Sequence, residues 1–222
     1  MGDTAQLTAS DGHKLAAYRA APPGQAKGGL VIAQEIFGIN GHIRRVCDRY
    51  AADGFEVVAP ALFDRIEHGV ELDYSDASIQ KGRALRGQLK DDDLVRDVSA
   101  AAASLQAARA AVVGYCFGGY VAWVAAGQVD GLSAAVCYYG GGIAGKKALQ
   151  PQCPVQMHFG DRDGAIPLSD VAAIQAEHPK IPIFVYDGAG HGFCCDERAS
   201  FDADACERAR RRTLAFLDDH LG

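Results

Sequence analysis

Short apolar runs, rich in β-branched residues, alternate with helix-like segments from residue 29 to the end of the chain. Such runs, bounded by glycine or proline, are typical of buried strands. Strands joined by helices pair in parallel, and helices then cover both faces of the sheet. The pattern therefore predicts an α/β fold with a mostly parallel sheet, whose strands are expected at 29–35, 55–60, 110–116, 133–140, 154–160 and 182–188.

The segments between these runs have helical periodicity. Ile43, Val46, Cys47, Tyr50 and Ala51 form one apolar helix face. Further helices are expected at 117–127, 171–178 and 202–220, with helical spacing also present across 75–108. Residues 6–10 and 14–20 are expected to form an antiparallel hairpin at the sheet edge, and segment 61–92, the least regular part, to cap a site.

Composition sets the broad class of the protein. The chain has 222 residues, of which 49% are hydrophobic, so we expect a single domain over residues 1–222 with a substantial core. Its net charge of −6 and its lack of a basic run argue against nucleic acid or an anionic membrane as a partner. The sequence shows neither a signal-peptide pattern nor an apolar run of the roughly 18 residues that span a membrane. We expect a soluble cytoplasmic protein, either monomer or dimer.

The chain contains seven cysteines, at positions 47, 116, 137, 153, 194, 195 and 206. They include no CxxC pair, which argues against a zinc ribbon, and no metal is expected. In a reducing cytosol each cysteine is expected to be a small buried hydrophobe. Cys116 is the exception, because of the residues around it.

Residues 114–118 read Gly-Tyr-Cys-Phe-Gly, between an apolar strand and a helix. This is the G-x-S-x-G nucleophile elbow with cysteine in place of serine. A nucleophile at such a strained bend needs small neighbours two positions away, and glycine meets that need. The adjoining helix N-terminus favours a thiolate. Taken alone, the motif is equally compatible with a glycine-rich strand end carrying a buried cysteine.

The order of further polar residues favours catalysis. In α/β hydrolases the nucleophile is followed along the chain by an acid and then by a histidine. Here Asp161 and Asp163 come just after a predicted strand, and His191 lies in a glycine-rich loop after the last one. Catalytic groups belong at the carboxyl ends of strands in such sheets. Cys116, one of these aspartates and His191 are therefore expected to act together.

The sequence resembles the dienelactone hydrolase (carboxymethylenebutenolidase) family, which has the α/β-hydrolase fold. The matching pieces, in order over nearly the whole chain, are AQEIFG (33–38), GYCFGG (114–119), YYG (138–140), the stretch at 160–167 and AGHGF (189–193). The resemblance implies that Cys116 is the nucleophile, His191 the base and Asp163 the acid, with Asp161 the runner-up.

The resemblance also implies supporting groups. Glu35 matches the family's carboxylate beside the thiol. A carboxylate ending an apolar strand is costly unless it is partnered, although Glu35 could instead cap the helix near residue 40. The backbone N–H groups of Ile36 and Phe117 match the oxyanion hole, in which one donor follows the nucleophile and the other comes from an earlier strand–helix loop.

The substrate contacts are less well defined. Members that take dienelactone carry an arginine four residues after the catalytic histidine, and this chain has Cys195 there. Arg83 and Lys81 are candidates for a second family arginine, and Tyr139 lies in the matching YYG piece. The missing arginine predicts weakened selection for anionic lactones.

The sequence thus predicts a cysteine-nucleophile hydrolase of small esters or lactones, without a metal or organic cofactor. One alternative is a thioesterase or acyl transferase with the same three residues. Another, of a different class, is a non-catalytic ligand-binding or redox-sensing protein with a reactive thiol, for which the adjacent Cys194 and Cys195 give some support.

Overall fold

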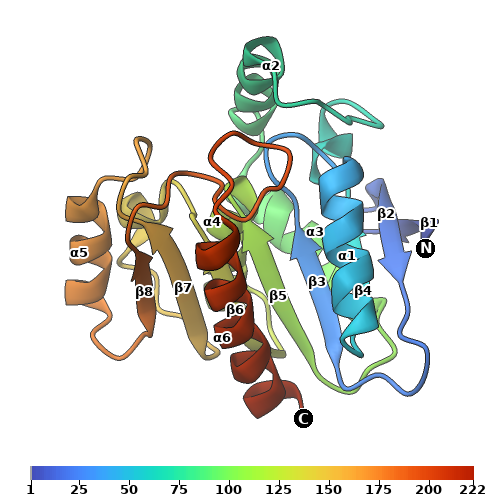
Figure 1. Ribbon diagram of the computed structural model, residues 1–222. Coiled ribbons are helices and arrows are strands. Elements are labelled where there is room, and N and C mark those ends of the chain that lie inside the picture. Colours follow the sequence, from blue (N-terminus) through green and yellow to red (C-terminus); the bar gives the residue numbers. More distant parts are fainter. Residues whose placement is uncertain (1) are drawn as a thin grey trace.

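One eight-stranded sheet runs through the computed structural model, which describes residues 2–222 (Figure 1). The strand order is β1-β2-β4-β3-β5-β6-β7-β8. The hairpin strands β1 and β2 pair antiparallel with each other, and β2 pairs antiparallel with β4, whereas all other pairs are parallel. The α/β prediction and the N-terminal hairpin are confirmed. The strands are β1 (Asp3–Thr8), β2 (Lys14–Ala20), β3 (Gly29–Ala33), β4 (Glu56–Pro60), β5 (Ala110–Tyr115), β6 (Leu132–Tyr138), β7 (Val155–Gly160) and β8 (Ile183–Tyr186).

Helices cover both faces of this sheet. In Figure 1, α1 (Gly41–Ala52) and α6 (Ala203–Leu221) lie in front of the sheet, while α3 (Asp91–Ala103) and α4 (Phe117–Gln128) lie behind it. A further helix, α5 (Leu168–Glu177), packs against the short 3₁₀ helix η2 (Ile143–Lys146). None of the helices within residues 2–222 has the length and apolar character needed to cross a membrane.

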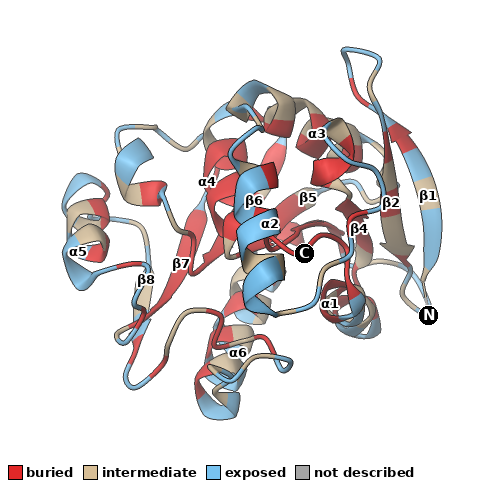
Figure 2. Cartoon of the chain, turned by 90° about the horizontal axis from the view of Figure 1, so that it is seen from above, coloured by how far each residue is buried: buried red, intermediate tan, exposed pale blue. Residues whose placement is uncertain are grey.

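The central strands are buried on both sides, which explains why they read as continuous apolar runs rather than alternating ones. Every residue of β3 is buried, as are Ala111–Tyr115 of β5 and all of β7. The edge strand β1, by contrast, is largely exposed (Figure 2).

The irregular segment after β4 rises over one end of the sheet. It begins with a 3₁₀ helix, η1 (Leu62–Arg65), and the helical spacing seen across 75–108 becomes two helices, α2 (Asp76–Arg86) and α3. Figure 1 places α2 beyond the carboxyl ends of the parallel strands, and the view from above in Figure 2 places it over the middle of the sheet.

An ion-pair network holds the base of this segment. Arg65, at the end of η1, makes two hydrogen bonds to the carboxylate of Asp97 on α3, at 2.8 and 2.7 Å. A third, at 2.8 Å, reaches Asp11 in the β1–β2 turn. Because a guanidinium binds a carboxylate bidentately in a fixed plane, this contact fixes where the chain leaves β4.

A tight turn joins β5 to α4. Cys116 sits in it with φ 55° and ψ −115°, a conformation that non-glycine residues rarely adopt. A Cβ atom on Gly114 would lie 1.8 Å from the carbonyl oxygen of Gly118, and one on Gly118 would lie 2.0 Å from that of Ala33. Glycine is therefore required at both positions because backbone, which cannot move aside, occupies the space.

We expect Gly118→Ala to destabilise the protein by roughly 3 kcal/mol, the upper end of ordinary overpacking costs, because the added methyl group meets the backbone of β3. The measurement is the urea midpoint at an unchanged slope. The control is Gly145→Ala, at an exposed position where a Cβ atom meets nothing within 4 Å. Equal midpoints for the two variants would contradict the account of the turn.

Candidate active site

The turn that strains Cys116 also directs its side chain toward the carboxyl ends of the strands. Its amide donates to the carbonyl of Tyr138 at the end of β6, at 3.0 Å, which locks the turn to the neighbouring strand. Cys116 is partly exposed, unlike the buried cysteines Cys47 and Cys137. The sequence-predicted nucleophile therefore stands at the start of α4, at the positive end of the helix dipole.

His191 lies within hydrogen-bonding distance of the thiol. The loop after β8 places its Nε2 atom 3.2 Å from Cys116 Sγ, and its Nδ1 atom 2.8 Å from Asp163 Oδ2. The other carboxylate oxygen of Asp163 accepts from the amides of Ala165 and Ile166, at 2.8 and 3.1 Å. A carboxylate held in this way accepts the Nδ1 proton, so Nε2 faces the sulfur.

The surroundings of His191 favour its charged form. Burial by itself lowers the pKa of this imidazole, but the hydrogen bonds with Asp163 and Cys116 and their negative charges outweigh burial and raise it to about 10. An imidazole with this pKa readily holds a proton taken from the thiol. The arrangement is therefore suited to a thiolate–imidazolium pair.

Asp161, the runner-up for the acid, binds a backbone amide, whereas Asp163 contacts His191. The Oδ1 atom of Asp161 accepts from the amide of Gly188 at 2.7 Å, across the loops that follow β7 and β8. Asp161 thus ties together the two loops that carry Asp163 and His191, without contacting the imidazole itself.

Two backbone N–H groups expected to bind an oxyanion lie beside the thiol. Phe117 is the first residue of α4, so its N–H has no partner within the helix. Ile36 lies in the turn after β3, and within residues 2–222 its N–H makes no hydrogen bond to another group. Both residues line the same cavity as Cys116.

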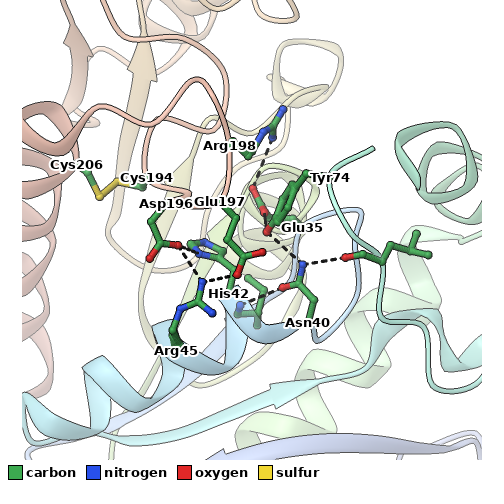
Figure 3. Close-up of polar contacts among 12 residues, drawn as sticks. Glu35, Asn40, His42, Arg45, Tyr74, Cys194, Asp196, Glu197, Arg198 and Cys206 are labelled. Atoms are coloured by element: carbon green, nitrogen blue, oxygen red, sulfur yellow. Dashed lines mark hydrogen bonds and ion pairs between the residues drawn. A yellow bond between two sulfur atoms is a disulfide. The ribbon is translucent and has the colours of Figure 1, made fainter. Parts of the chain in front are cut away.

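Glu35 is fully buried just after β3. Figure 3 shows it beside Tyr74 and Arg198. The hydroxyl of Tyr74 donates to its Oε2 at 3.1 Å, and Arg198 Nη1 lies 3.9 Å from its Oε1. It does not cap α1, because Asn40 accepts from the amide of Ile43 and fills that position. The capping alternative for Glu35 is therefore wrong.

A cavity of about 330 Å³ opens beside Cys116 and His191. Its apolar wall includes Phe37, Phe117 and Ile79, and three arginines complete the lining, namely Arg83 and Arg86 from α2 and Arg198 from the loop before α6. A wider hollow of about 940 Å³ lies at the opposite end of the sheet, near Gly28 and Arg109. Cys116, His191, Ile36 and Phe117 all line the cavity of about 330 Å³, which is therefore the candidate site.

Three of the four expected substrate contacts lie elsewhere. Arg83 lines the cavity, but Lys81 points to Glu67, with 2.6 Å between Nζ and Oε1. Tyr139 is fully buried and packs edge-on against His191, with 5.4 Å between ring centroids. Cys195 is fully buried next to Glu35 rather than facing the cavity.

Arg198 and Arg86 are charged cavity residues that the sequence did not indicate. Arg198 is seven residues after His191, and a search at the family's spacing of four finds Cys195 instead. The loop between β8 and α6 returns toward the cavity after Cys195, and this return brings Arg198 into place. Arg86 comes from the last turn of α2, where basic residues are also common on solvated faces, so its sequence position carried no signal.

The cysteines near His191 differ from the expectation that all would be free. Cys194 forms a disulfide with Cys206 on α6, across 12 residues. The sequence separation did not indicate this pairing, because the two cysteines meet only where a turn between 195 and 202 folds the chain back on itself. Cys195 remains a free thiol, and burial together with the charge of Glu35 raises its pKa to about 12. The adjacent pair that supported a redox-sensing role is therefore split between two environments.

Known proteins resemble this chain in sequence and in structure. A candidate carboxymethylenebutenolidase of Synechocystis sp. is 34% identical, covering 94% of this chain and 93% of its own, and one of Escherichia coli K12 is 32% identical, covering 96% and 85%. The crystal structure of a candidate dienelactone hydrolase from Klebsiella pneumoniae superposes with a TM-score of 0.83 at 27% identity, covering 97% of this chain and 98% of that one.

The family model of the dienelactone hydrolases matches residues 15–221. This match includes the strained turn, the loops that carry Asp163 and His191, and α2. The chain is therefore a member of the dienelactone hydrolase family, with the α/β-hydrolase fold.

Proposed function

We propose that this protein hydrolyses small carboxylic esters or lactones, with Cys116 as the nucleophile. The observation that carries the proposal is the continuous chain of contacts from Cys116 Sγ through His191 to Asp163, at 3.2 and 2.8 Å, beside an arginine-lined cavity. Nucleophile, base and orienting acid in hydrogen-bond contact are the arrangement that acyl transfer requires.

In the first half of the reaction, the thiol proton passes to Nε2 of His191 and the sulfur attacks the substrate carbonyl carbon. A C–S bond forms, and the carbonyl oxygen takes up the negative charge. The N–H groups of Ile36 and Phe117 are proposed to hold this oxyanion. Removing one such donor in other enzymes costs about 3–4 kcal/mol of transition-state stabilisation.

In the second half, the tetrahedral intermediate collapses and the C–O bond to the leaving group breaks. The His191 imidazolium gives its proton to the leaving oxygen, and a thioester remains on Cys116. Water then gives a proton to His191 and attacks the thioester. The C–S bond breaks, releasing the acid and restoring the thiol. Asp163 holds the imidazole in the orientation that both proton transfers need.

The arginines indicate the kind of ester. Arg83, Arg86 and Arg198 enter one small cavity from two separate segments, and Arg198 also faces the buried carboxylate of Glu35. Guanidinium groups bind carboxylates bidentately and strongly when partly desolvated. We therefore propose a substrate with a free carboxylate. In this proposal Arg198 compensates for the absence of arginine at position 195. Selection for anionic lactones is then retained, in contrast to the weakened selection that the sequence predicted.

Replacing Cys116 tests the nucleophile. We expect Cys116→Ala to fold normally and to lose hydrolysis of small aryl esters, because the other described residues that line the cavity include no thiol or hydroxyl group. Mass spectrometry with a slowly hydrolysed ester should place the acyl group on Cys116 in the wild type. Cys153→Ala, at a buried free thiol, is the matched control. An acyl group on Cys195 would refute the assignment.

The two aspartates are expected to differ. Asp163→Asn should lower kcat by roughly 10²–10⁴-fold, the usual contribution of positioned acid–base catalysis, because an amide can favour the wrong imidazole tautomer. Asp161→Asn should cost much less, since its contact is with the backbone of Gly188. Steady-state kinetics on one ester decide between them, and equal losses in kcat would mean that the acid has been chosen wrongly.

Arg198 is expected to select for charge. The substitution Arg198→Ala should reduce kcat/KM for an acidic dienelactone by about 10- to 100-fold, since a charge-assisted pair contributes roughly 1.5–3 kcal/mol. The corresponding methyl ester should change far less. Arg198→Lys should restore the preference only in part, because lysine lacks the planar fork. Equal losses for the acid and its methyl ester would show that Arg198 supports the fold and not the substrate.

A further inference from the structure

Behind the catalytic cavity, three side chains of metal-binding type converge in the protein interior. They are Glu35 from the turn after β3, His42 from α1 and Cys195 from the loop before α6. One potential ligand atom from each lies within 4.8 Å of the other two. All three side chains are buried, with residue exposures of 0%, 3% and 0%. We call this group the Glu35 cluster.

Two of these atoms lack a partner. Within residues 2–222, Glu35 Oε1 and His42 Nε2 are buried without a hydrogen bond. The nearest cation to Glu35 Oε1 is Arg198, whose Nη1 lies 3.9 Å away, too far for a hydrogen bond. Buried polar atoms are nearly always satisfied, so an unpaired carboxylate oxygen and an unpaired imidazole nitrogen in one buried cluster call for a further group that binds them.

The surroundings fix the direction in which His42 presents its free nitrogen. His42 Nδ1 lies 3.1 Å from Asp196 Oδ1, and Asp196 is held in turn by Arg45, also at 3.1 Å (Figure 3). A carboxylate can only accept, so Nδ1 carries the proton and neutral His42 leaves a lone pair on Nε2. A carboxylate that orients a histidine in this way is the usual support for a metal-bound imidazole.

Glu35 is positioned from its other side. The hydroxyl of Tyr74 donates to Oε2 at 3.1 Å, while Asn40 Nδ2 lies 3.2 Å from the same hydroxyl oxygen (Figure 3). These contacts occupy one carboxylate oxygen and leave Oε1 without a hydrogen bond. The Glu35 cluster therefore has two ligand atoms oriented by neighbouring groups, which distinguishes it from a chance grouping of polar residues.

We propose that Glu35, His42 and Cys195 bind a zinc-type divalent cation. One thiolate, one imidazole and one carboxylate are the donors that Zn²⁺ prefers, and three protein ligands leave one position for water. On binding, the Cys195 S–H proton leaves to solvent as the sulfur–metal bond forms. The charges of the thiolate and of Glu35 then balance the cation. This proposal reverses the expectation, from the cysteine spacing, that the chain has no metal site.

A bound cation would join three segments that are far apart in sequence: the end of β3, helix α1 and the loop carrying Arg198. We therefore expect the cation to raise the unfolding temperature, since it binds the folded chain and not the separated segments. The proposal does not depend on the proposed hydrolase activity.

The test uses Co²⁺ and Zn²⁺ with the Cys116→Ala variant, so that the Cys116–His191 pair cannot bind the metal. Co²⁺ should bind in a 1:1 ratio and give the charge-transfer band of a cobalt–thiolate bond. Zn²⁺ should displace it and should remain with the protein through gel filtration. Ester hydrolysis by the wild type is measured separately, so failure of the metal site and failure of the proposed function are distinguishable.

Further substitutions in the same background identify the ligands. Adding Cys195→Ser or His42→Gln should remove the band and the retained zinc, whereas Cys153→Ser, at another buried thiol, should leave both unchanged. Asp196→Ala, which spares all three ligands, should weaken zinc binding by about 10- to 100-fold. Circular dichroism without metal shows that each variant is folded. A band that survives Cys195→Ser, or zinc lost on gel filtration from Cys116→Ala, would overturn the proposal and leave a bridging water as the third group.

Discussion

The close approach of the β5–α4 turn to β3 is the constraint on which the rest of the site depends. Gly118 contacts the backbone of Ala33, and this contact holds Cys116 in a backbone conformation that few residues adopt. The surrounding sheet stabilises this strained conformation, because both neighbouring strands hold the turn in place. Because β3 is one of those strands, the same contact also sets the positions of Ile36 and Glu35, which follow it directly.

Glu35 stands between two environments. On one side it faces Arg198, which lines the cavity beside Cys116, and on the other it faces the buried nitrogen of His42. A carboxylate buried this deeply is stable only with partners, and the contacts from Tyr74 and Arg198 provide them for part of its surface. The loop between β8 and α6 supplies both Arg198 and Cys195. Its disulfide to α6 therefore steadies residues on both sides of Glu35.

Much of the fold could be predicted from local patterns. The central strands read as continuous apolar runs because they are buried on both faces, so their sequences show no polar alternation. The nucleophile elbow was also recognisable from the sequence, because the five-residue motif around Cys116 contains the two glycines that its close backbone contacts require. Asp163 and His191 could then be identified from two rules. The acid and the histidine follow the nucleophile in that order, and catalytic groups lie at the carboxyl ends of strands. Each of these signals is local or depends only on order along the chain.

The sequence by itself determined the class of sheet, the strained turn and the three residues that meet there. Only the tertiary structure decided which residues line the cavity and which are buried behind it. Arg198 and Cys195 are three positions apart in one loop, yet one faces the cavity and the other packs against Glu35. Cys194 likewise meets Cys206 only because the chain folds back before α6. Periodicity ends where regular structure ends, so the side to which a loop residue points is set by packing against distant segments.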